Sequence, residues 1–159
     1  PWLLERGRVV EEPQNQEIVI LVADADDGHA KLIEHNLRES GVRNRIRRFR
    51  DGREVLDFFF ADGGYQPQGS YLLLLDIRMP RVDGVEVLEQ LKSCERFKKL
   101  PIVMLTTTDD PVEIATCYRL GCNVYITKPV NYETFTETLR RLGLFILIVQ
   151  VAALDGTDA

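Results

Sequence analysis

Short apolar runs alternate with amphipathic segments along most of this chain. Residues 18–23 are apolar throughout, which is typical of a strand that is covered on both faces. Similar runs predict further strands at residues 46–49, 71–75, 101–106 and 124–127. Apolar residues at helical spacing predict helices at residues 30–40, 52–61, 84–93 and 111–120, and a last one from about Tyr132.

This alternation predicts an α/β fold with five parallel strands and helices on both faces of the sheet. We expect one folded domain over residues 17–142, after a tail of uncertain structure at residues 1–16. Residues 143–159 are expected to form an apolar extension and a tail. In a sheet of this kind, ligands bind at the carboxyl ends of the strands.

Polar side chains with reactive or charged groups follow four of the predicted strands. Asp24 follows the first strand, Asp76 the third, Thr106 ends the fourth, and Lys128 follows the fifth. Two carboxylates, a hydroxyl and an ammonium at one edge of a sheet are an unusual set for packing alone. We therefore expect the functional site there.

The sequence around these strand-end residues resembles that of a known family. The stretch "LLLLDIRMPRVDG" around Asp76, together with Thr106 and "YITKP" (125–129), resembles the receiver domain of two-component response regulators over residues 18–142. A looser likeness links "GHAKLIEHNLR", the long 62–70 loop and "RRLGLFILIVQ" to the single-domain regulators of bacterial phytochrome kinases. The resemblance implies a CheY-like fold with strand order 2-1-3-4-5.

The resemblance also implies a role for each of these side chains. Asp76 would accept a phosphoryl group from a sensor histidine kinase, Lys128 would contact the phosphate as a point charge, and Thr106 would donate its hydroxyl to it. Mg²⁺ would be held by Asp24, Asp76, the backbone carbonyl of Arg78 and waters.

Two further residues match positions of the family. When Thr106 moves toward the phosphate, the ring of Tyr125 would rotate into the vacated space, so both residues would form a switch. Pro129 follows Lys128, and the family usually has a cis bond there, although the sequence does not show the isomer.

Ala25 departs from the family, which places a second acid there as the principal metal ligand. A methyl group cannot coordinate a cation, and Asp26 need not substitute, because successive side chains of an extended segment point to opposite sides. We expect weakened Mg²⁺ binding and slower phosphorylation. A degenerate receiver, working as an interaction module without phosphorylation, is the alternative.

The segment around Asp24 and Ala25 also resembles a second family. "VILVADADDG" is similar to the opening of haloacid-dehalogenase-type phosphatases, in which Asp24 would be the nucleophile and Asp26 the acid-base. Such enzymes lack the turn from Asp76 to Gly84, favour Thr or Val where Gly28 stands, and need a later acidic pair that we do not find. A flavodoxin-like cofactor binder is a weaker alternative still, because no phosphate loop rich in Ser, Thr and Gly follows the first strand.

The C-terminal segment carries apolar residues on opposite sides of a helix. Phe135, Leu139, Leu142, Ile146 and Val149 can cover the sheet, and the segment would be either a longer helix or an extended arm after Gly143. We expect a homodimer through the second set, since a monomer would expose it; this set is Leu144, Phe145, Leu147, Ile148 and Val151. Contact with Trp2, Leu3 and Leu4 of the same chain is the alternative.

Composition narrows the classes of partner. The 159 residues carry a net charge of −5, which argues against nucleic-acid binding, and we interpret the basic cluster Arg43, Arg45, Arg47, Arg48 and Arg50 as a solvated strand edge. Cys94, Cys117 and Cys122 lack metal-site spacing, and no run is long enough to span a membrane, so we expect a cytoplasmic protein.

With no length left for an output domain, we expect a phosphoacceptor rather than an enzyme. It would assist its own phosphorylation and dephosphorylation and signal to an unidentified downstream protein.

Overall fold

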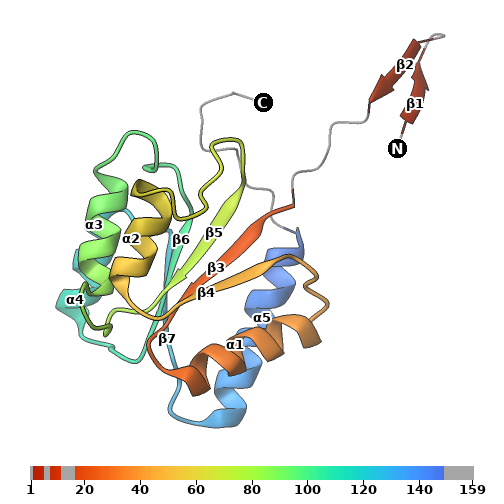
Figure 1. Cartoon of the computed structure of the whole chain (residues 1–159). Helices are drawn as coiled ribbons and strands as arrows, with labels where there is room; N and C mark the ends of the chain where they lie inside the picture. The colour runs from red at the N-terminus through yellow and green to blue at the C-terminus, as the bar shows by residue number, and fades with distance from the viewer. Residues whose placement is uncertain (1, 6–7, 12–16, 149–159) are drawn as a thin grey trace.

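A five-stranded parallel sheet lies at the centre of the computed structural model, which describes residues 2–5, 8–11 and 17–148 (Figure 1). The strands are β3 (Val19–Ala23), β4 (Ile46–Phe49), β5 (Tyr71–Leu75), β6 (Ile102–Thr106) and β7 (Val124–Thr127). The helices are α1 (Asp27–Glu39), α2 (Gly52–Phe60), α3 (Gly84–Lys92), α4 (Pro111–Leu120) and α5 (Tyr132–Ile148).

The strand order is β4-β3-β5-β6-β7, which is the expected order 2-1-3-4-5 when only these five strands are counted. Ala23 is paired with Leu75 in register, and Thr106 with Thr127. Because all these pairs are parallel, the residues that follow the strands meet at one edge. The predicted fold class is confirmed.

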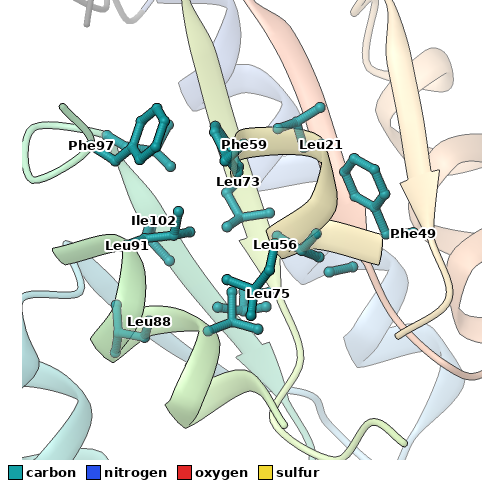
Figure 2. Close-up of a cluster of buried hydrophobic side chains, with 14 of the residues drawn as sticks. Leu21, Phe49, Leu56, Phe59, Leu73, Leu75, Leu88, Leu91, Phe97 and Ile102 are labelled. Carbon is teal, nitrogen blue, oxygen red and sulfur yellow. The ribbon is translucent and has the colours of Figure 1, made fainter. Parts of the chain in front are cut away.

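Two layers of helices cover the sheet. Helices α1 and α5 lie on one face, and α2, α3 and α4 lie on the other (Figure 1). Figure 2 shows the larger core, where Leu21, Leu73 and Leu75 of the sheet face Leu56 and Leu88 of α2 and α3. Because both faces are covered, β3 and β5 consist of apolar residues, and all five residues of β5 are buried.

Aspartates at the strand-to-helix turns set where the helices begin. Asp26, Asp51, Asp83 and Asp110 are the N-caps of α1 to α4, and each carboxylate accepts a hydrogen bond from a backbone N–H of the first turn. The cap at Asp26 starts α1 at Asp27, three residues before the predicted start. The prediction was wrong there because it followed the apolar pattern and missed the cap.

Helix α5 continues through Gly143 to Ile148, so the extended-arm alternative does not hold within the described residues. Gly143 is buried, and a Cβ there would lie 2.6 Å from the Cβ of Ser40 at the end of α1. Glycine thus allows close packing of the two helices. Leu144, Phe145 and Ile148 are exposed, whereas Val149 and Val151 lie outside the described residues.

Other expectations concern the edges of the molecule. The predicted tail contains β1 (Trp2–Glu5) and β2 (Arg8–Glu11), which pair as an antiparallel hairpin. Strand β4 is an edge strand. Arg43, Arg45 and Arg50, which flank it, are exposed, but Arg47 within it stacks on the ring of Phe58, with 4.9 Å from its guanidinium carbon to the ring centroid. The solvated-edge interpretation is therefore wrong for Arg47, and also for Arg48, which is half-buried.

Within residues 2–5, 8–11 and 17–148, no helix is both long and apolar enough to cross a membrane.

Candidate functional site

Asp24, Asp76 and Lys128 meet where β3, β5 and β7 end. The ammonium nitrogen of Lys128 lies 2.5 Å from Oδ2 of Asp24 and 3.2 Å from Oδ2 of Asp76. The second oxygen of each carboxylate accepts a backbone N–H, from Asp26 at 2.9 Å and from Ile77 at 2.7 Å. Both carboxylates are thus fixed by one shared cation and by the turn that follows their own strand.

These three side chains are buried, which determines their electrostatics. The side chains of Lys128 and Asp24 are each 2% exposed, and that of Asp76 is 11% exposed. Burial raises the pKa of Asp24 above its usual value, although the hydrogen bond and charge of Lys128 oppose the rise. Two carboxylates and one ammonium leave the cluster one negative charge in excess when both acids are ionised, so it can take up further positive charge.

Thr106 ends β6 at the same edge, and its carbonyl accepts the N–H of Lys128 at 2.6 Å. The side chain is fully buried, and its hydroxyl oxygen has no hydrogen-bond partner in the structure. A buried hydroxyl without a partner is costly. The Thr106 hydroxyl is therefore available to an acceptor brought into the site.

Gly84 shapes the turn that carries Asp76. A Cβ at Gly84 would lie only 2.0 Å from the carbonyl oxygen of Asp76, and the Gly84 N–H donates to the carbonyl of Ile77 at 2.8 Å. Only glycine permits this approach. The Asp-Gly pair in "MPRVDG" therefore has two local functions, since Asp83 caps α3 and Gly84 lets the chain pass behind Asp76.

Tyr125 lies in β7, one edge strand of the sheet. Its hydroxyl donates to the carbonyl of Thr108 at 2.8 Å, in the loop that connects β6 to α4. Burial is the main cause that raises its pKa to about 12. Thr108 in turn donates to Glu113 of α4 at 2.9 Å. The ring therefore anchors the loop that follows Thr106.

The residues after Asp24 do not supply a third carboxylate to the cluster. Ala25 is exposed, Asp26 caps α1 by accepting the N–H of His29 at 2.9 Å, and Asp27 pairs with Arg48. These partners lower the pKa of both Asp26 and Asp27. Each acid near Ala25 already has a local function in the structure.

The donor set fits a reduced site for a divalent cation. Among the described residues there is no group of three or more His, Cys, Asp or Glu side chains placed to hold a metal ion. Asp24 and Asp76 remain, and the carbonyl of Arg78 is two residues beyond Asp76. Mg²⁺ is commonly held by one or two carboxylates with waters, so these donors can bind it with fewer protein ligands than a site with a third acid.

The tertiary structure adds three details that the sequence left open. The Arg78 side chain points to Glu113, at 3.2 Å, and is mostly exposed. The Lys128–Pro129 bond is trans, since the described chain has no cis peptide. Sequence reasoning missed His29, whose Nδ1 lies 3.2 Å from Nζ of Lys128. The sequence held one indication that His29 could reach the site, which is its position shortly after Asp24, in the first turn of the helix that follows β3.

Comparison with known proteins identifies the family. The model of the response regulator receiver domain matches residues 20–140. The probable methanogenesis regulatory protein FilR2 of Methanothrix harundinacea (strain 6Ac) is 34% identical over 139 residues, covering 87% of this chain and 88% of FilR2. The solved receiver domain from Rhodospirillum rubrum is 44% identical with a TM-score of 0.83, covering 87% of this chain and 100% of that one. The phosphorylated cyanobacterial phytochrome response regulator RcpA is 29% identical with a TM-score of 0.74, covering 83% and 95%.

The matched region contains all four strand-end positions, Asp24, Asp76, Thr106 and Lys128. The phosphatase interpretation is not supported, because Asp26, its acid-base, caps α1 instead. Fold, clustered site and family match agree: this chain belongs to the response regulator receiver domain family.

Proposed function

We propose that Asp76 accepts a phosphoryl group from a sensor histidine kinase and that the chain signals through protein contacts. The observation that carries this proposal is the convergence of Asp24 and Asp76 on the buried ammonium of Lys128. RcpA, a relative, is a phytochrome response regulator in its phosphorylated form, so a phytochrome kinase is the donor we propose. The site of action would be the cytoplasm.

The proposed step is a phosphoryl transfer. A carboxylate oxygen of Asp76 attacks phosphorus, an O–P bond forms, and the P–N bond to the kinase histidine breaks with its electron pair returning to the imidazole. Asp76 is buried but still 11% exposed at its side chain, which leaves a path for the donor. Lys128 would shift from the carboxylate to the charge of the phosphoryl oxygens.

Receiver domains generally bind Mg²⁺, which neutralises phosphoryl charge when bound. In this chain Asp24, Asp76 and the Arg78 carbonyl would hold it. Ala25 removes one ligand, so we propose weaker metal binding than in a site with an acid at this position. The surplus negative charge of the cluster still favours a cation there.

The proposed switch begins at Thr106. Its buried hydroxyl has no partner in the structure and would donate to the phosphoryl group. Movement of Thr106 would displace the loop whose Thr108 carbonyl accepts from Tyr125, at 2.8 Å. Loss of that hydrogen bond would free the ring to rotate and would alter the surface of α4 and β7. This is how a local charge would change the affinity for a downstream protein.

Phosphorylation by a small acyl-phosphate donor with Mg²⁺ tests the proposal, read as intact mass. The variants are this chain and Ala25→Asp, each with and without Asp76→Asn. We expect an adduct in this chain, faster formation in Ala25→Asp, and none with Asp76→Asn. An adduct confined to Ala25→Asp would mean that this chain is the degenerate alternative, while an adduct that persists in Asp76→Asn would refute the assignment of the acceptor.

We also propose a homodimer through the exposed apolar face of α5. This face consists of Leu144, Phe145, Leu147 and Ile148, which are 53%, 51%, 48% and 80% exposed. The opposite face of α5 is covered by the sheet and α1, whereas about half or more of each of these four side chains faces solvent. Val151, also expected in the interface, lies outside the described residues.

Sedimentation of the full chain at micromolar concentration tests the dimer. Phe145→Glu with Ile148→Glu should give a monomer, because charge at the centre of an apolar interface is costly. Val130→Glu is the control, since Val130 is exposed but lies outside α5. A monomeric parent, or equal dissociation of both variants, would contradict the proposal.

A further inference from the structure

His29 contacts the phosphorylation site but has no part in the roles given above. It lies in the first turn of α1, and its Nδ1 is 3.2 Å from the ammonium nitrogen of Lys128. Its ring meets Phe135 of α5 edge to face, with 5.9 Å between centroids. The side chain is 37% exposed, so one part faces the site and another reaches the surface.

Counting donors and acceptors gives His29 a specific role. An ammonium has three N–H donors and no acceptor. Three acceptors surround Nζ of Lys128: Oδ2 of Asp24 at 2.5 Å, Oδ2 of Asp76 at 3.2 Å and Nδ1 of His29 at 3.2 Å. Because the Lys128 side chain is only 2% exposed, an unpaired N–H would be costly. His29 completes the set.

The contact also determines the tautomer of His29. Since the ammonium only donates, Nδ1 must offer its lone pair, and the proton of the neutral ring lies on Nε2. The nearest acid to the same nitrogen is Asp26, whose Oδ2 is 4.0 Å away and outside hydrogen-bond distance. Nδ1 therefore has Lys128 as its partner.

We propose that His29 is a positioning residue for Lys128 and directs its ammonium toward Asp76. With one N–H bound to Asp24 and one to His29, the third is left for Asp76 and for the phosphoryl oxygens that it would carry. Without the Nδ1 acceptor, the ammonium moves toward Asp24, which already holds it at the shorter distance. This inference rests on the proposed phosphorylation of Asp76.

Two substitutions separate this role from simple packing. In His29→Asn, the side-chain oxygen can occupy about the position of Nδ1, so the acceptor is kept while most of the ring is lost. In His29→Leu, the contact with Phe135 is kept as an apolar contact while the acceptor is lost. A positioning role predicts that asparagine restores the property measured, and a packing role predicts that leucine does.

The first measurement is the ¹H–¹⁵N signal of the Lys128 ammonium in the full chain, assigned by its disappearance in Lys128→Met. A fully hydrogen-bonded, buried ammonium exchanges slowly with water and is observable at low temperature. We expect the signal in the parent and in His29→Asn, and its loss in His29→Leu. Retention of the signal in His29→Leu would overturn the inference, as would absence of a Lys128 signal in the parent.

The second measurement is the rate of Asp76 phosphorylation by the small acyl-phosphate donor. We expect His29→Leu to be about tenfold slower, as for the loss of one hydrogen bond to a charged group, and His29→Asn to be close to the parent. Equal rates in all three proteins would overturn the role of His29. If no protein is phosphorylated, the proposed function fails, and the ammonium signal still decides whether His29 holds Lys128.

Discussion

Replacing Lys128 by methionine should destabilise the protein far more than the loss of an ordinary salt bridge. Methionine keeps most of the side-chain volume but removes the ammonium that contacts both Asp24 and Asp76. Their side chains are 2% and 11% exposed, so water cannot readily replace the lost partner. Breaking a buried pair in this way typically costs about 3–5 kcal/mol. We expect this loss near pH 7.

The loss should shrink in acid, and its sign follows from Asp24. Burial already raises the pKa of Asp24 above 3.8, and Lys128 is the main opposing cause, so the pKa rises further in Lys128→Met. For a carboxyl whose pKa is raised in the folded state, the folded protein binds more protons than the unfolded one. The stabilising effect of the protonated Asp24 carboxyl is fully present below pH 3.8 and is lost as the pH rises through the pKa that Asp24 has in the folded protein. Lys128→Met should therefore lie closer to the parent near pH 4 than near pH 7.

Urea denaturation followed by circular dichroism at both pH values measures the effect. Lys98→Met is the matched control, because Lys98 pairs with Glu95 at 2.8 Å but the two side chains are 50% and 86% exposed. An exposed pair of this kind contributes about 0–1 kcal/mol. If the two variants lose equal stability near pH 7, or if the loss in Lys128→Met grows on acidification, the account of a buried, charge-coupled cluster is wrong.

Two further predictions concern the turn behind Asp76 and the loop after β6. Gly84→Ala should cost at least about 2 kcal/mol in urea denaturation, because its Cβ would lie 2.0 Å from the Asp76 carbonyl oxygen. In Gly28→Ala the Cβ would lie 3.2 Å from Oδ1 of Asp26, the side-chain oxygen that caps α1, so this oxygen must shift slightly. This control should therefore cost less than about 1 kcal/mol, and equal losses in the two variants would contradict the steric argument. One phenol should titrate at about 12 in the ultraviolet spectrum and be missing in Tyr125→Phe, and stability should fall between about pH 10 and 12, more in the parent than in the variant. A difference titration centred near 10 would contradict the burial of Tyr125.

Local patterns were sufficient for the architecture because they report burial and backbone conformation directly. Strand β5 is rich in leucine because both faces of the sheet are covered. Gly121 ends α4 with a φ of 107°. Element ends were predicted less well. The start of α1 is set by the hydrogen bond from the His29 N–H to Asp26, and Gly143, through which α5 continues, packs closely against Ser40 at the end of α1. Both contacts concern partners that the apolar pattern does not contain.

The alternation of apolar runs and amphipathic segments is enough to predict the parallel sheet and therefore the edge at which Asp24, Asp76, Thr106 and Lys128 gather, because the ends of parallel strands lie together whatever loops connect them. Which atoms meet at that edge depends on the packing of elements that are far apart in the sequence. His29 and Lys128 are separated by 99 positions, and their 3.2 Å contact arises only when α1 and the end of β7 occupy fixed places around the sheet. Burial of the site, which determines the strength of its charges, is likewise a property of all the packed layers and of no single segment.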